Sequence, residues 1–124
     1  MEIEEIRRAA LRSLVPPPRI QLSDWIEAEI SLPEGVSAQP GPVRLWPFQR
    51  EIADSIGDPL IEHVTLIKPV RVGFTTLLTS AVASFVANDP SPILCLLPTE
   101  ADARDYVVSA VAPIFAASGA VSAA

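Results

Sequence analysis

Apolar and charged residues are distributed over the first fifteen positions in the pattern of an amphipathic helix. The apolar residues that share one face of such a helix are Ile3, Ile6, Ala10 and Leu14. Three consecutive prolines at 16–18 end the pattern, because proline cannot donate the helical hydrogen bond and stiffens the chain. We therefore expect residues 1–15 to form a separate N-terminal helix.

Residues 16–45 have the composition of a Pro-rich linker with one short helix in it. Ser23 is suited to cap a helix over 24–30, which has acidic residues near its positive end. Five prolines and glycines interrupt residues 31–43, so we expect a loop there.

From residue 46 onward, helical and strand-like patterns alternate. The expected helices cover residues 47–56, 75–87 and 100–112, and the expected strands cover 63–67 and 93–97. Two buried strands joined by a helix imply a right-handed crossover and a parallel pair. Because two strands are too few for a stable sheet, the pattern predicts an α/β fold in which residues 46–115 are the first part of a larger domain.

Composition narrows the class of protein. The chain has 124 residues, 49% of them hydrophobic, and a net charge of −6, which excludes a strongly basic nucleic-acid module as an account of the whole chain. One cysteine and one histidine cannot build a disulfide framework or a zinc cluster, and a reducing cytoplasm fits. The uncharged stretch 106–124 is rich in Ala and Ser and contains a proline and a glycine. We expect a helix followed by a loose Ala/Ser-rich tail over 116–124, and no membrane anchor.

Residues 64–76 carry the most informative chemistry. They combine a strand, a turn with two cations, and hydroxyls that open an apolar helix, a layout that can hold a phosphate. Against the pattern G-x-x-x-x-G-K-[ST], Gly73 and Thr75 match, whereas Lys68 replaces the first glycine and Phe74 replaces the lysine. The residues alone leave open a variant phosphate loop or an ordinary strand–turn–helix.

Three segments in order resemble the ATPase domain of the GpA-type phage terminase large subunit. They are Trp46–Arg50 (W-P-F-Q-R), Lys68–Thr75 (K-P-V-R-V-G-F-T) and Leu96–Ala103 (L-L-P-T-E-A-D-A). The family carries a P-F-Q segment, a K-S-A-x-V-G-x-[ST] loop and an L-P-T-x-x-D-A segment at similar separations. The resemblance extends to about Phe115 and includes the upstream region.

The resemblance implies a fold and a function. The fold would be an incomplete P-loop-type (RecA/helicase-like) ATPase core, with parallel strands flanked by helices and preceded by a helical N-terminal segment. The function would be that of an ATP-driven motor, also an endonuclease, that packages viral double-stranded DNA through a portal into procapsids. ATP and Mg²⁺ are the implied cofactors. A terminase small subunit is the implied partner of helix 1–15, although that helix could equally pack on its own domain.

The resemblance also assigns roles in the loop, as a variant Walker A motif over 68–75. Lys68 would neutralise the β- and γ-phosphates, Arg71 would assist, Gly73 would let the backbone approach, and Thr75 would coordinate Mg²⁺, with Thr76 as second choice. Without a ligand, the same residues read as exposed turn cations and a helix cap.

Two further segments keep two interpretations. Gln49 would hydrogen-bond the edge of adenine, with the Trp46 ring stacking on the base. Alternatively, the segment would be a helix start with Trp46 and Phe48 in the core. Thr99 would couple the motor to a DNA phosphate, or it would cap the helix that follows it.

ATP hydrolysis also needs an acidic pair at a strand end to hold Mg²⁺ and polarise water. No apolar run in this sequence ends in Asp-Glu, and in the family that strand lies beyond position 124. We therefore assign no catalytic residue and expect residues 1–124 alone neither to hydrolyse ATP nor to cut DNA. The alternative is a truncated, non-catalytic prophage remnant, or a module that only binds the small subunit.

Overall fold

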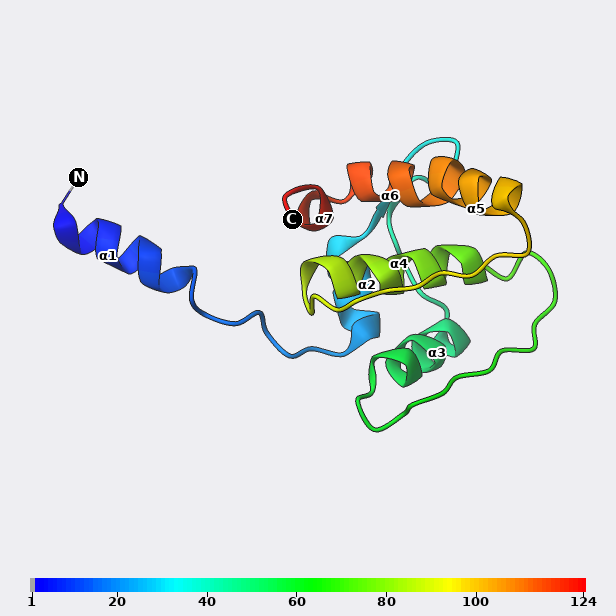
Figure 1. Ribbon diagram of the computed structural model, residues 1–124, viewed down its shortest axis with the longest axis horizontal. Helices are drawn as coiled ribbons and strands as arrows, with labels where there is room; N and C mark the ends of the chain where they lie inside the picture. The colour runs from blue at the N-terminus through cyan, green and yellow to red at the C-terminus, as the bar shows by residue number, and fades with distance from the viewer. Residues whose placement is uncertain (1) are drawn as a thin grey trace.

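The chain forms a small helical assembly with one helix set apart from it (Figure 1). The structure is a computed structural model and describes residues 2–124. Its elements, in order, are α1 (Ile3–Arg12), α2 (Leu22–Glu29), β1 (Ser31–Leu32), β2 (Gly41–Pro42), α3 (Pro47–Gly57), α4 (Phe74–Ala87), α5 (Glu100–Tyr106), η1 (Val107–Val111), α6 (Ala112–Ala117) and α7 (Gly119–Ser122).

Helix α4 forms the centre of the assembly and contacts α2, α3, η1, α6 and α7. Its buried face combines apolar residues such as Leu77 with small hydroxyl residues. Thr79 and Ser80 are fully buried, yet each hydroxyl donates to the main-chain carbonyl four residues earlier, at 2.7 Å. Because those hydroxyls are satisfied within the helix, they can lie in an apolar core at little cost.

Helix α2 supplies the largest apolar side chains of the core, including Trp25 and Ile26, and packs on α3 and α4. It begins at Leu22, so the prediction that Ser23 caps it is wrong. The reason is a contact between helices. Asp54 on α3 accepts a hydrogen bond from the Ser23 N–H at 3.0 Å and so supplies the acceptor that a capping side chain would have provided.

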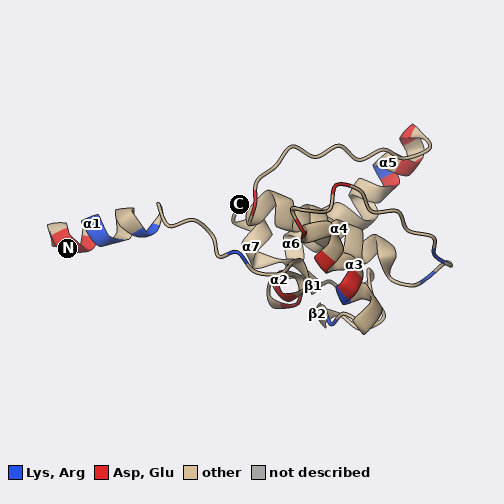
Figure 2. Ribbon diagram, turned by 90° about the horizontal axis from the view of Figure 1, so that it is seen from below, with Lys and Arg blue, Asp and Glu red and all other residues tan. Residues whose placement is uncertain are grey.

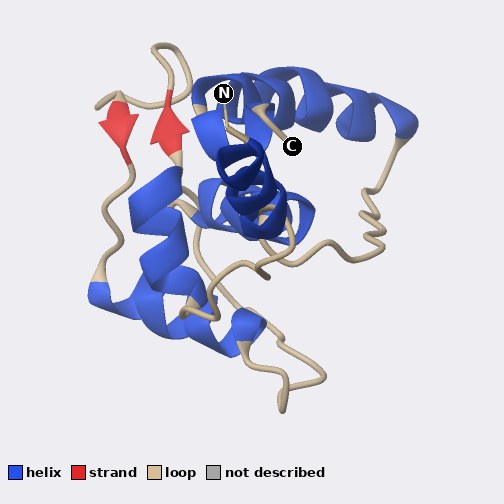
Figure 3. Ribbon diagram, turned by 90° about the vertical axis from the view of Figure 1, so that its left-hand side faces the viewer, coloured by secondary structure: helices blue, strands red, loops and turns tan. Residues whose placement is uncertain are grey.

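The segment expected to be a loop contains a short antiparallel hairpin. Ser31 pairs with Pro42 and Leu32 with Gly41 (red in Figure 3). A hydrogen bond from the Ser31 N–H to the Ser118 hydroxyl, 3.1 Å long, ties the hairpin to the C-terminal end of the chain.

The C-terminal region is one continuous helical run followed by a short helix. The π-turn η1 lies between α5 and α6 and ends two residues before Pro113. Proline removes a helical donor and crowds the preceding turn, and a widened turn relieves that crowding. The tail does not run loosely as expected, because α7 buries Val121 against the core. No helix among residues 2–124 is long and apolar enough to cross a membrane.

The two predicted parallel strands are not formed. Residues 63–67 and 93–97 run as extended segments without strand pairing, and the side chains of Ile67, Leu94 and Leu96 are more than four-fifths exposed. A strand needs hydrogen-bonding neighbours and cover on both faces, and neither segment finds them within the described chain. The described fold is therefore helix-rich with a two-stranded sheet, and the parallel P-loop core stays a prediction.

Helix α1 forms within the predicted range 1–15 but is shorter, covering Ile3–Arg12, and it contacts little else. None of its residues is buried, and it extends away from the other helices on the Pro-rich linker (Figures 1 and 2). Two ion pairs join Glu4 to Arg7 and Arg8 along its own surface. Contacts within α1 itself therefore stabilise the helix, and its apolar face is left uncovered.

Candidate nucleotide-binding site

The turn that leads into α4 has an unusual backbone. Arg71 has a φ of 61° and Gly73 a φ of 75°, both in the left-handed region. Glycine adopts this conformation freely, whereas arginine adopts it only at a cost. Turns that mix left-handed residues with right-handed ones can present successive backbone N–H groups to one anion. The strained residue Arg71 thus lies within the segment for which the family resemblance implies phosphate binding.

Lys68 lies beside the start of the same helix. Its Nζ is 5.8 Å from the centre of the Phe74 ring, and Phe74 is the first residue of α4. An ammonium group and the positive end of a helix dipole then lie near each other, and an anion placed there would interact favourably with both. Lys68 thus packs against Phe74, the residue that replaces the lysine of the G-x-x-x-x-G-K-[ST] pattern.

Thr75 and Thr76 occupy the first turn of α4, as predicted. The Thr75 side chain is exposed and that of Thr76 is half-buried. Mg²⁺ in nucleotide sites takes one or two protein oxygens together with phosphate oxygens and water. The Thr75 hydroxyl fits that role as a single ligand. No group of three or more His, Cys, Asp or Glu side chains among residues 2–124 is placed to hold a metal ion.

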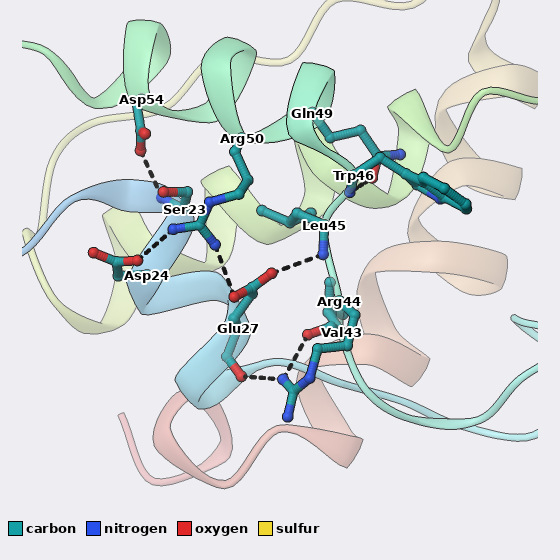
Figure 4. A network of polar contacts seen from close by, with 10 residues as sticks. All are labelled: Ser23, Asp24, Glu27, Val43, Arg44, Leu45, Trp46, Gln49, Arg50 and Asp54. Carbon is teal, nitrogen blue, oxygen red and sulfur yellow. Dashed lines mark hydrogen bonds and ion pairs between the residues drawn. The ribbon is translucent and has the colours of Figure 1, made fainter.

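Gln49 and Trp46, at the start of α3, have different environments. Gln49 is 9% exposed, and its amide joins the start of α3 to the loop. Its Oε1 accepts from the Trp46 N–H at 2.9 Å (Figure 4). Its Nε2 donates to the Val72 carbonyl, also at 2.9 Å. Trp46 is 68% exposed and Phe48 49% exposed, so the alternative that both rings lie in the core is wrong. The structure brings Gln49 and the loop together and leaves the Trp46 ring accessible.

An ion-pair network that the sequence did not predict fixes α3 on α2. The Arg50 guanidinium bridges Asp24 and Glu27, with its Nη1 2.7 Å from Glu27 (Figure 4). Glu27 also accepts from the Leu45 N–H at 2.9 Å. That backbone hydrogen bond, with the nearby arginine, lowers the pKa of Glu27, and the two carboxylates raise the pKa of Arg50. Local sequence could not reveal this network, because the partners of Arg50 lie 23 and 26 positions earlier in the chain.

A small pocket of about 180 Å³ lies between the loop and helices α3 and α4. Its lining is mainly apolar and includes Phe48, Ile52, Leu66, Pro69, Val72 and Leu77. Pockets that enclose whole ligands are larger, roughly 300–1,000 Å³. This pocket alone is therefore too small to enclose a nucleotide.

Thr99 forms the cap that one of its two interpretations predicted. Its hydroxyl accepts from the Asp102 N–H at 3.1 Å and donates to the Asp102 carboxylate at 2.8 Å. It begins α5, which starts on the same side of the molecule as α4 (Figure 1). The cap is confirmed, and a contact with DNA stays a prediction.

A cationic turn at the head of an apolar helix is the arrangement by which nucleotide-dependent ATPases hold phosphate. The profile of the phage terminase large subunit gpA, ATPase domain, matches residues 37–124. The chain belongs to this family.

Two curated relatives agree with that assignment. The terminase large subunit of Escherichia phage lambda is 34% identical over 106 residues, covering 86% of this chain and 16% of the relative. That of Enterobacteria phage P21 is 35% identical over 103 residues, covering 83% and 16%. The chain thus spans about a sixth of the length of these relatives. No solved structure matches it. The resemblance inferred from the three segments is confirmed.

Proposed function

We propose that this chain supplies the phosphate-binding part of an ATP-driven motor that packages phage DNA. The observation that carries the proposal is the left-handed turn at Arg71 and Gly73, with Lys68 beside the first residue of α4, in a chain of the terminase family. Lys68 would neutralise the β- and γ-phosphates, with Arg71 assisting, and Thr75 or Thr76 would be the Mg²⁺ ligand. The exposed Trp46 ring would stack on the base.

Thermal stabilisation of the chain tests this proposal. A ligand at 100 times its Kd raises the free energy of unfolding by roughly 2.7 kcal/mol, so Mg²⁺–ATP and Mg²⁺–tripolyphosphate should each raise the Tm by several degrees. Lys68→Ala should remove most of the effect. Arg19→Ala, which removes the same charge from the linker, should leave it unchanged. Equal losses in both variants would contradict a specific role for Lys68.

We propose further that this chain binds nucleotide without turning it over. Acidic pairs that hold Mg²⁺ and polarise water follow apolar strands in such ATPases, and no apolar run of this sequence ends in such a pair. Phosphate release should therefore stay at background with Mg²⁺–ATP and DNA present. Turnover that depends on Mg²⁺ and is abolished by Lys68→Ala would overturn this proposal.

A second function, docking of a terminase small subunit on α1, is favoured by one observation. The helix buries none of its residues and exposes Ile3 by 85% and Ile6 by 52%. An amphipathic helix on a stiff linker is suited to enter an apolar groove of a partner. Co-purification with a small subunit should be lost with Ile3→Glu/Ile6→Glu and kept with Arg8→Ala. Retention in the double variant would contradict docking through this face. DNA and portal contacts, including one at Thr99, stay predictions for the assembled motor.

A further inference from the structure

The side chain of Gln49 lies where the loop becomes helix α4. Its nearly buried amide connects two backbone segments 26 residues apart, the Trp46 N–H and the Val72 carbonyl. The two contacts also fix the orientation of the amide, because the reverse orientation would place donor against donor and acceptor against acceptor. Gln49 is therefore held by the main chain on both sides.

A close contact with Gly73 extends this connection. A methyl group built on Gly73 would lie 2.7 Å from Gln49 Nε2, closer than side-chain carbons approach a nitrogen. Gly73 is the left-handed residue whose carbonyl accepts the first hydrogen bond of α4, from the Leu77 N–H at 3.1 Å. The amide thus touches the residue whose backbone sets the direction of the turn.

We infer that Gln49 is a positioning residue that holds the loop 68–75 in its phosphate-binding conformation, and not the residue that reads the base. The hydrogen bond to Val72 and the packing against Gly73 fix the turn, which in turn places Lys68 and the N–H groups of α4. The role in phosphate binding rests on the proposed function of this loop, whereas the role in ordering the loop does not.

The test uses Gln49→Glu. Glutamate keeps the acceptor for the Trp46 N–H but replaces the donor to Val72 with a second acceptor. Gln39→Glu makes the same change at an exposed loop position and is the matched control. Gln49→Met, which has similar volume and no donor, serves if the glutamate variant does not fold. Affinities for ATP, GTP and inorganic tripolyphosphate, each with Mg²⁺, are measured by calorimetry.

If Gln49 positions the loop, its replacement should reduce the affinities for ATP, GTP and tripolyphosphate together. Removing one hydrogen bond should weaken all three ligands alike, roughly three- to tenfold. Without ligand, hydrogen exchange should become faster at the backbone amides of residues 72–74. Exchange in α2 should stay unchanged. Faster exchange in α2 as well would indicate a general loss of stability. Gln39→Glu should change neither measurement.

Two results would overturn the inference. A loss confined to ATP, with tripolyphosphate binding intact, would make Gln49 the reader of adenine. Unchanged exchange at 72–74 would show that the loop is held without it. If the wild-type chain binds none of the three ligands, the proposed function fails, and the exchange measurement still decides whether Gln49 orders the loop.

Discussion

Arg71 holds a left-handed backbone angle that an L-residue adopts only at a cost. Replacing it by glycine should raise the free energy of unfolding by up to about 1 kcal/mol, because the steric penalty exceeds the added freedom of the unfolded chain. Urea denaturation measures the change. Arg71→Asn removes the same charge with a residue that tolerates this angle, so it should stabilise the chain less. Destabilisation by both variants would show that the arginine side chain makes contacts that outweigh the strain.

Gly73 and Gly35 form a matched pair for the same measurement. Both have a positive φ, 75° and 88°, but an added methyl meets Gln49 only at Gly73 and open space at Gly35. Gly35→Ala should lower the free energy of unfolding by about 1 kcal/mol, from backbone strain alone. Gly73→Ala should lower it by clearly more, because the added methyl also meets Gln49. Gln49→Ala should reduce the extra cost at Gly73, because it removes the atom that clashes. Equal costs at the two glycines would contradict the close packing of Gln49 on the turn.

Local sequence identified the loop but not what holds it. The spacing of Lys68, Gly73 and Thr75 indicated a cation, a turn and a helix start, all of which are local properties. The hydrogen bond between Gln49 and Val72 joins residues 23 positions apart, and no periodicity encodes such a contact. The position of Lys68 on Phe74 likewise depends on the path of the turn and not on the motif alone.

At the level of elements, the contact between α2 and α3 depends on charge. Glu27 has a lowered pKa in the folded chain, so its contribution to stability is complete above its ordinary pKa of 4.5 and is lost as the pH falls through the folded value. Glu27→Gln should lower the Tm by a few degrees at pH 7, and the difference from wild type should shrink below pH 4.5. Glu29→Gln, on the same helix and exposed, should have little effect at either pH. A difference that persists at low pH would assign the effect to packing.

Helices were predictable from this sequence and strands were not, for one physical reason. The hydrogen bonds of a helix lie within the segment, so Pro47, Gly57 and Thr99 set the helix boundaries locally. A strand pairs with residues elsewhere, and the apolar runs at 63–67 and 93–97 indicate a need for cover without specifying what provides it. The tail shows the converse, since its Ala/Ser composition gave no sign that Val121 would be buried.

At the level of the whole molecule, apolar surface is distributed unevenly. The buried core gathers around α2 and α4, while α1 and the extended segments before α4 and α5 expose large apolar side chains. Contiguous exposed apolar surface is typical of sites that meet another chain or segment. The uncovered face of α1 and the uncovered extended segments are separate surfaces, so they can be tested separately.

Deleting residues 1–15 should leave the stability of the remaining chain unchanged, within about 0.5 kcal/mol, because no residue of α1 is buried. Deleting 116–124, a shorter piece, should lower it by more than 1 kcal/mol, because this piece contains the buried Val121 and the Ser118 hydroxyl that binds Ser31. Urea denaturation followed by tryptophan fluorescence reports both, since Trp25 is buried in the core.

A helix as short as α1 is marginal alone in water, so it should gain helicity when a partner covers its apolar face. A clear loss of stability on removing 1–15 would instead mean that α1 packs on its own domain, and the docking proposal would lose its support.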